Sequence, residues 1–213
     1  MSLPTVILLL KAPRPNEVKT RLAASVGPAI AVSIYRQMVD KLRGVFPPDW
    51  PVQIHYSPAD AELEMKRWLA DHRRPRLTFQ AQADGDLGDR LATAFTLAFS
   101  NGATQVFALG GDCPALTSPL LESAHALLST HDAVLGPADD GGYYLLGLRS
   151  AQPSLFTDIR WGTSSVLPVT RRRLAELKLR TAELPTLSDV DDHASWRRAV
   201  AAGWLENTPV NNR

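Results

Sequence analysis

The sequence has one cysteine and no apolar run long enough to span a bilayer. Cys113 is the only cysteine among 213 residues, which excludes an internal disulfide and a zinc site built from several cysteines. We therefore expect a reducing compartment, the cytoplasm. The apolar run at residues 4–10 is far shorter than the roughly 20 residues of a transmembrane helix. It also lacks the basic segment and cleavage site of a signal peptide.

The sequence also lacks an excess of charge of either sign. Its 23 lysines and arginines and 22 aspartates and glutamates give a formal net charge of +1. The chain therefore has no global field that would attract nucleic acid or an anionic membrane. The five histidines show no metal-ligand spacing, and neither a GxSxG nor an HExxH motif is present. We expect neither a nucleic-acid partner nor a membrane span, and the sequence does not indicate an oligomeric state.

The composition that remains is typical of a globular protein. Apolar residues make up 45% of the chain and charged residues 21%, which is ordinary usage for a folded domain. No repeat, low-complexity tract or linker divides the chain, and its length lies within the usual single-domain range. We predict one domain over residues 1–207 and a frayed tail over residues 208–213.

Short apolar runs alternate with helical patterns along the chain. Strands are predicted at residues 4–10, 52–56, 77–80, 105–109, 133–135 and 143–148. Helical spacing predicts helices at residues 18–42 with a break at Gly27-Pro28, 59–72, 88–100, 117–128, 164–179 and 193–203. In the second of these helices, Leu63, Trp68 and Leu69 are expected to face inward. The alternation predicts an α/β fold with a mostly parallel sheet, in which ligands bind beyond the carboxyl ends of the strands.

The first polar cluster follows the first predicted strand. It places four cations between a strand and the start of a helix, where free N–H groups and the helix dipole favour phosphate. The glycine patterns of a Walker A loop and a Rossmann turn are absent. A solvated basic turn is the alternative interpretation. The four cations are Lys11, Arg14, Lys19 and Arg21.

The second cluster follows the strand at residues 105–109. Gly110 and Gly111 allow a ligand to approach the backbone closely. Asp112 suits Mg²⁺, which commonly takes one or two carboxylates and completes its shell with phosphate and water. Alternatively, Asp112 caps the next helix, although Thr117 or Ser118 is better placed to do so.

The third cluster is the segment Asp139-Asp140-Gly141-Gly142-Tyr143. Asp-Gly between apolar runs is a strong hairpin signal, and a tight turn alone explains the two glycines. It does not explain the adjacent carboxylates or the tyrosines that follow. Asp139 and Asp140 are candidates for binding sugar hydroxyls or a metal, or for acting as a general base.

Two later segments also carry candidate residues. Trp161 precedes Thr163 and Ser164, either of which is a candidate N-cap of the next helix. The carboxylates of Asp189, Asp191 and Asp192 fall within four residues, and they either complete a metal shell or solvate a loop.

An earlier loop offers two alternatives as well. Asp86 or Asp89 is placed to cap the helix that follows. The same loop is also a candidate for contacting the base or the acceptor, with Arg90 directed toward a phosphate or a carboxylate.

Taken in order, these motifs read KAPRPNEVKTRLA, GDLGDRL, GGDCPAL, GPADDGGYYLLGL, WGTSSV and DVDD, from about residue 6 to residue 192. The series resembles a bacterial glycosyltransferase family whose members are often described as arsenosugar-biosynthesis glycosyltransferases. The resemblance implies a GT-A-like nucleotide-diphospho-sugar transferase fold, a three-layer α/β/α sandwich. It also implies a more distant similarity to guanylyltransferases for 2-phospho-lactate and for molybdenum cofactors.

The resemblance implies roles for the matched positions, with Mg²⁺ or Mn²⁺ as the cofactor. Nucleotide phosphates would contact Lys11, Lys19 and Arg21. The metal would bind Asp112, with Asp189 and Asp191 completing its site. The pocket for donor or acceptor would include Asp139, Asp140, Gly141 and Gly142. We also assign Asp86, Arg90, Tyr143 and Trp161 to the substrate pocket.

Three departures from the family pattern bear on these roles. Asn16 stands where glycine is usual, although asparagine also tolerates left-handed backbone. Asp192 stands where threonine is usual, which leaves open which late carboxylate faces the metal. Asp112-Cys113-Pro114 lacks the second aspartate of an Asp-x-Asp motif, and this favours nucleotidyl transfer.

We expect a nucleotide or nucleotide-sugar and a small-molecule acceptor as partners. The leading hypothesis is glycosyl transfer from a nucleoside-diphosphate sugar, because a metal-bound, cradled diphosphate is a good leaving group. The first alternative is guanylyl or cytidylyl transfer to a phosphorylated small molecule, which needs nearly the same residues. The second alternative is a nucleotide-binding protein without catalytic activity.

Overall fold

A single sheet forms the centre of the computed structural model, which describes residues 3–71 and 76–208. The strand order is β3-β2-β1-β4-β6-β5-β7. Strand β6 runs antiparallel to both neighbours, and the other pairs are parallel. The mostly parallel sheet is therefore confirmed. The strands are β1 (Thr5–Lys11), β2 (Val52–Ser57), β3 (Leu77–Ala81), β4 (Val106–Leu109), β5 (Ala133–Pro137), β6 (Tyr143–Leu148) and β7 (Thr181–Glu183).

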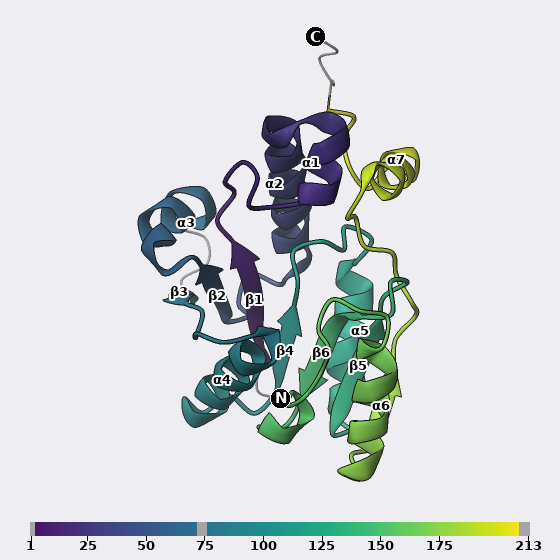
Figure 1. Ribbon diagram of the computed structural model, residues 1–213. Helices are drawn as coiled ribbons and strands as arrows, with labels where there is room; N and C mark the ends of the chain where they lie inside the picture. Colours follow the sequence, from purple (N-terminus) through teal and green to yellow (C-terminus); the bar gives the residue numbers. More distant parts are fainter. Residues whose placement is uncertain (1–2, 72–75, 209–213) are drawn as a thin grey trace.

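Helices cover both faces of the sheet, which makes the three-layer α/β/α arrangement visible in Figure 1. One layer contains α1 (Thr20–Val26), α2 (Pro28–Val45), α3 (Glu62–Leu69), α5 (Ser118–Leu128) and α7 (His193–Ala201). The other contains α4 (Leu87–Ser100), the short 3₁₀ helix η2 (Pro153–Leu155) and α6 (Val166–Glu176). A second 3₁₀ helix, η1 (Ala59–Ala61), leads into α3.

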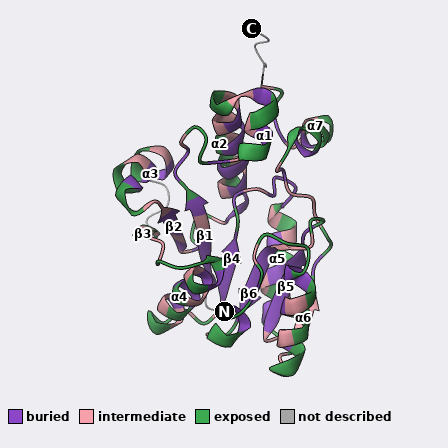
Figure 2. Cartoon of the chain, in the orientation of Figure 1, coloured by how far each residue is buried: buried purple, intermediate pink, exposed green. Residues whose placement is uncertain are grey.

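The hydrophobic core has two parts, one on each face of the sheet, because successive side chains of a strand point to opposite faces. In β1, Val6 and Leu8 pack toward α2, while Ile7 between them packs toward α4; all three are fully buried. Figure 2 shows the strands buried and the outer helix faces exposed. The apolar run at the start of the chain is thus a central strand. Among the described residues, no helix combines the length and apolarity needed to cross a membrane.

The hairpin predicted around Asp139 and Asp140 connects β5 and β6. The N–H of Ala138 donates to the carbonyl oxygen of Gly142 at 3.0 Å, and Gly141 has a φ of 89°. That φ lies in the left-handed region, where glycine carries no side-chain penalty. The hairpin brings the start of β6 to the same sheet edge as the carboxyl ends of β4 and β5.

The structure corrects the prediction for residues 59–72. The segment begins with η1, its α-helix ends at Leu69, and His72 lies outside the described residues. Leu63 is 63% exposed, contrary to the prediction, and Met65 and Leu69 are the buried side chains of α3. Leu63 lies two positions before Met65, which is about 200° around the helix, so it faces away from the buried side.

The C-terminal part differs from the prediction at two places. Strand β7 was not predicted, and it pairs with β5 at the edge of the sheet. Thr208, assigned to the frayed tail, accepts a hydrogen bond at 2.8 Å from Nε2 of Gln37. The remainder of the predicted tail, residues 209–213, lies outside the described residues.

Candidate functional site

A cavity of about 570 Å³ lies at the carboxyl ends of β1 and β4. The loops after β1, β4 and β5 contribute to its walls, as do the segments around residues 161 and 190. Loops far apart in sequence therefore share one rim of the sheet. The predicted residues that line it are Lys11, Lys19, Arg21, Gly110, Gly111, Asp112, Asp140, Gly142, Tyr143, Trp161, Asp189 and Asp191.

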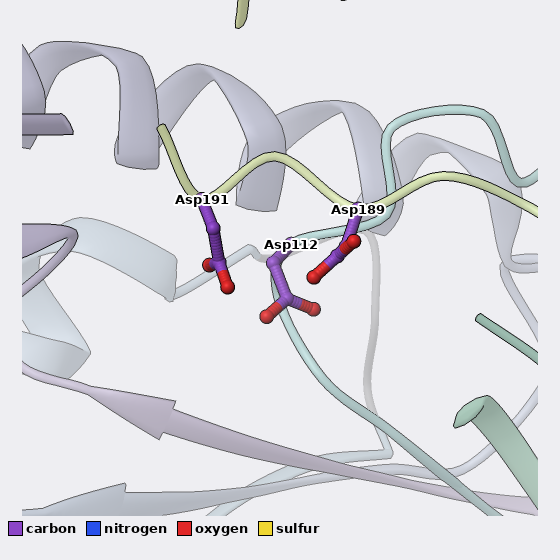
Figure 3. Close-up of side chains that lie close together, drawn as sticks. All are labelled: Asp112, Asp189 and Asp191. Atoms are coloured by element: carbon purple, nitrogen blue, oxygen red, sulfur yellow. The ribbon is translucent and has the colours of Figure 1, made fainter. Parts of the chain in front are cut away.

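Three of these residues form an acidic triad, Asp112, Asp189 and Asp191. One carboxylate oxygen from each lies within 4.8 Å of the others. Figure 3 shows Asp112 on the loop after β4 and the other two on one later segment that passes beside it. The N–H of Val190 donates to the carbonyl oxygen of Asp112 at 2.9 Å. This backbone hydrogen bond fixes the two segments against each other.

Lys19 provides a positive charge within the acidic triad. Its Nζ lies 2.6 Å from Oδ1 of Asp191 and 3.4 Å from Oδ2 of Asp112, and its side chain is 9% exposed. Burial alone lowers the pKa of Lys19, but the two carboxylates outweigh it, so the pKa is raised and the ammonium stays charged. Arg21 lies farther out, with Nη1 3.9 Å from Oδ2 of Asp191.

The surroundings of Asp189 disfavour its charged form. Burial raises its pKa, and the nearby carboxylates of Asp112, Asp140 and Asp191 raise it further, to about 6. A divalent cation would reverse this effect by favouring the charged form. The donor set consists of carboxylate oxygens, the ligands that Mg²⁺ and Mn²⁺ prefer. The triad therefore fits the cation that the sequence predicts.

The two predicted catalytic aspartates have different positions. Asp140 lines the cavity, and its Oδ1 accepts a hydrogen bond from the N–H of Gly142 at 2.7 Å. Asp139 does not line it; its carboxylate accepts a hydrogen bond from the hydroxyl of Ser188, and its N–H donates to the carbonyl oxygen of Leu187. Asp139 thus holds the segment that carries Asp189, and Asp140 faces the ligand space.

Four further predicted residues also lie outside the cavity lining. Arg14 pairs with Glu64 at 2.9 Å and with Asp60 at 3.5 Å, which directs it toward α3. Arg90 donates to Oε1 of Gln82 at 3.2 Å.

The other two, Asp86 and Gly141, have structural roles. Asp86 is the N-cap of α4 and forms a reciprocal capping box with Asp89, as one of the two interpretations anticipated. A Cβ on Gly141 would lie 2.6 Å from Cα of Ser164. Gly141 therefore permits the close packing of the β5–β6 turn against the segment before α6.

Two of the three departures from the family pattern, those at Asn16 and Asp192, are explained by the backbone and by helix capping. Asn16 has a φ of 64°, the left-handed conformation that glycine or asparagine tolerates. Asp192 caps α7 through a hydrogen bond from the N–H of Ser195. The late acidic motif is therefore divided, with Asp189 and Asp191 in the triad and Asp192 in a helix cap.

Sequence reasoning did not identify Tyr35 and Gln82 as supports of the site. The hydroxyl of Tyr35 donates to the carbonyl oxygen of Lys11 at 3.1 Å and accepts from its N–H at 3.2 Å. Gln82 donates to the carbonyl oxygens of Leu10 and His55. Both fix the end of β1. Tyr35 sits at apolar helical spacing in α2, so its sequence signal is that of a core residue.

Cys113 is a structural residue beside the triad. Its thiol is buried, and burial together with the charge of Asp112 raises its pKa to about 12. The thiol therefore stays protonated at neutral pH, which excludes a thiolate nucleophile at this position.

Comparisons with known proteins identify the family. Residues 45–163 match the family described as "Uncharacterized protein conserved in bacteria (DUF2064)", and the chain belongs to this family. A protein of Desulfovibrio desulfuricans G20, provisionally described as a nucleotide-diphospho-sugar transferase, is 33% identical over 94% of this chain and 96% of that chain, with a TM-score of 0.82. The chain thus has the nucleotide-diphospho-sugar transferase fold. No curated protein matches it.

More distant structures share the fold alone. The Rv0371c protein of Mycobacterium tuberculosis H37Rv, solved as a complex with manganese, is 14% identical over 94% of this chain and 100% of its own, with a TM-score of 0.52. The inositol-1-phosphate CTP transferase of T. maritima is 12% identical over 98% and 99% of the two chains, with a TM-score of 0.60.

Proposed function

We propose that this chain is a metal-dependent transferase that moves a glycosyl group from a nucleoside-diphosphate donor to a small acceptor. The observation that carries the proposal is the acidic triad together with Lys19, which pairs with Asp112 and Asp191. All four residues line one cavity beyond the carboxyl ends of the parallel strands. Carboxylates for a divalent cation and a cation for phosphate lie within one site. A nucleoside diphosphate bound to Mg²⁺ or Mn²⁺ needs both.

The residues divide into three roles. Lys11, Lys19 and Arg21 would contact the diphosphate. The acidic triad would hold the divalent cation, which when bound offsets the negative charge that develops on the departing diphosphate. Asp140 would accept the proton of an acceptor hydroxyl, because it lines the cavity and the N–H of Gly142 fixes its carboxylate.

The comparisons support this proposal. The Desulfovibrio relative carries the description of a nucleotide-diphospho-sugar transferase, and the ordered motifs resemble the arsenosugar-biosynthesis glycosyltransferases. Manganese is present in a structure of the same fold. These similarities support the class of donor and the metal, and the experiment below tests which nucleotide or nucleotide sugar binds.

The test is a measurement of melting temperature against nucleoside triphosphates, diphosphates and nucleotide sugars, each with and without Mn²⁺ or Mg²⁺. A ligand at about 100 times its dissociation constant adds roughly 2.7 kcal/mol, which corresponds to about 5–11 °C for a domain of this size. We expect a metal-dependent shift that disappears in Asp112→Asn. The matched control is Asp192→Asn, which removes a carboxylate outside the triad and keeps the shift. Absence of a shift with every nucleotide, in folded wild-type protein, would refute the proposal.

Nucleotidyl transfer is the second candidate, and the end of β4 favours it. The loop after β4 supplies one carboxylate, Asp112, because the buried Cys113 is followed by Pro114 and not by a second aspartate. A single carboxylate at this point departs from the Asp-x-Asp pattern of glycosyltransferases. Product analysis separates the candidates: glycosyl transfer releases a nucleoside diphosphate, and nucleotidyl transfer releases pyrophosphate.

A further inference from the structure

The cavity has an apolar wall that the proposed phosphate and metal chemistry does not use. Its side chains come from β1, the first turns of α4, the start of β6, and the segment that leads into α6. Elements distant in sequence thus present hydrocarbon and ring surface to the same space that the acidic triad lines. The apolar wall consists of Leu9, Leu87, Leu91, Tyr143, Trp161 and Val166.

Leu87 is the most exposed part of this wall. Its side chain is 41% exposed. Among the described residues, the only other exposed large hydrophobic side chains are those of Leu63 and Leu177. Of these three leucines, only Leu87 lines this cavity. A leucine that faces water inside a concave site gains free energy when a ligand covers it, because apolar surface then leaves water.

The aromatic part of the wall is held in place by close packing. The rings of Tyr143 and Trp161 meet edge to face, with centroids 6.5 Å apart and an interplanar angle of 79°. A Cβ on Gly88 would lie 2.8 Å from Nε1 of Trp161 and 2.4 Å from the carbonyl oxygen of Phe156. The glycine therefore lets α4 approach the tryptophan, and the wall is preformed.

The polar atoms of these rings do not face the cavity. The hydroxyl of Tyr143 and Nε1 of Trp161 are buried and have no hydrogen-bond partner. The wall therefore cannot use these atoms to recognise the polar edge of a base. Specific recognition of a nucleobase depends on hydrogen bonds to such an edge. The ring faces and leucines fit a hydrocarbon group instead.

We propose that the apolar wall binds a hydrophobic group of the acceptor, an aryl or branched alkyl substituent next to the reacting hydroxyl. The inference rests on the proposed transferase function, because that function supplies the acceptor. It adds the class of acceptor: an alcohol with a hydrophobic substituent. A fully hydroxylated sugar would place hydroxyl groups against leucine side chains that offer them no hydrogen-bond partner.

The test uses 4-fluorobenzyl alcohol as the probe, with fluorine NMR line broadening measured on the full chain without nucleotide. We expect binding to the wild-type protein and about a tenfold weaker affinity in Leu87→Gln, because the apolar contact is lost. Glutamine is tolerated at this position because it is exposed and glutamine is a good helix former. The matched control is Leu63→Gln, which changes an exposed leucine of α3 and leaves probe affinity within about twofold of wild type.

A second measurement separates this inference from the proposed function. The affinity of the Mn²⁺ complexes of ATP, GTP, CTP and UTP is compared between wild type and Leu87→Gln. Equal nucleotide affinity together with weaker probe binding supports the acceptor assignment. Weaker nucleotide binding in Leu87→Gln would overturn it, because the wall would then hold the base. Equal affinity of Leu87→Gln and Leu63→Gln for the fluorinated probe would overturn the acceptor assignment as well. If no nucleotide binds but the probe still depends on Leu87, the hydrophobic site stands and the transferase proposal fails.

Discussion

The ammonium of Lys19 lies 2.6 Å from Oδ1 of Asp191, although 172 positions separate the two residues in sequence. The same ammonium reaches Oδ2 of Asp112 at 3.4 Å. One cation thus connects the loop after β1, the loop after β4 and the segment before α7. It also reduces repulsion among the three carboxylates of the triad, so the chain supplies part of its own neutralising charge.

Replacing Lys19 tests this role. In Lys19→Met the carboxylates lose their shared counterion, and we expect a loss of about 1–2 kcal/mol in the free energy of unfolding. This loss is smaller than the usual cost of breaking a buried ion pair, because the side chains of Asp112 and Asp191 are 40% and 41% exposed. Urea denaturation measures the effect, and Mn²⁺ is expected to stabilise the variant. Lys66→Met, which removes an exposed pair with Glu62, serves as control and is expected to leave the free energy of unfolding close to that of wild type. Equal stability of Lys19→Met and wild type would contradict the role.

Metal affinity should depend on pH through Asp189. Because the pKa of this carboxyl is raised to about 6, a cation that binds below that pH must displace a proton. We expect Mn²⁺ affinity to be constant above about pH 7 and to fall roughly tenfold per pH unit below about pH 6. Titration of free Mn²⁺ by electron paramagnetic resonance gives the profile. Asp189→Asn should bind Mn²⁺ more weakly with a flatter profile, and an unchanged profile would contradict the assignment.

The same carboxyl should affect stability with the opposite sign. Its pKa is raised on folding, from the ordinary value of 3.8 to about 6, so between these values the folded chain binds more protons than the unfolded chain. Without metal, its contribution to the free energy of unfolding therefore decreases as pH rises through this window. The measurement is the difference in unfolding free energy between wild type and Asp189→Asn at pH 4 and pH 7. A difference that does not vary with pH would contradict the raised pKa.

The neighbouring carboxylates Asp191 and Asp192 should behave differently. Asp192→Ala removes the N-cap of α7, and we expect it to cost about 1 kcal/mol of stability while leaving Mn²⁺ affinity unchanged. Asp191→Ala removes a member of the triad and should weaken Mn²⁺ binding. Calorimetric titration with Mn²⁺ and thermal melts of both variants provide the comparison. Loss of Mn²⁺ affinity in Asp192→Ala would show that the triad has been assigned incorrectly.

Gly141 and Gly162 allow a test of close packing at the β5–β6 turn. Both have positive φ, of 89° and 74°, but a Cβ on Gly141 would meet Ser164 at 2.6 Å, while nothing lies within 4 Å of one on Gly162. Gly162→Ala should cost about 1 kcal/mol from backbone strain. Gly141→Ala should cost about 2–4 kcal/mol because a clash is added. Urea denaturation of both variants gives the difference, and equal losses would mean that the turn adjusts freely.

The strands and the site edge were predictable because they depend on local pattern. The run from Val6 to Leu10 packs on both faces of the sheet, which its unbroken apolar sequence indicates. Strand β7 was missed because its three residues, Thr181–Glu183, carry no apolar run. Its position depends on pairing with β5, which no local pattern shows.

The direction of each charged side chain was less predictable. Arg14 and Lys19 lie in one basic loop, yet Arg14 pairs with α3 and Lys19 with the triad. Asn16 and Lys19 both have left-handed backbone conformations, and these change the direction of the loop between Arg14 and Lys19. In the same way, Asp139 and Asp140 are adjacent, and only Asp140 lines the cavity. Residue type indicated the candidate site, and tertiary contacts determined which of the predicted residues line the cavity.

Strand β6 also constrains the order in which the molecule can be assembled. It lies between β4 and β5 and is the only link between the two halves of the described sheet, although it follows β5 in the chain. A nascent chain that stops before Tyr143 leaves the edge of β4 unpaired, and such an edge invites association with other chains. The triad is completed later still, at Asp191. The ability to capture a cation is therefore acquired only after the strands of both halves of the sheet have been synthesised, and it reports that the two halves have joined.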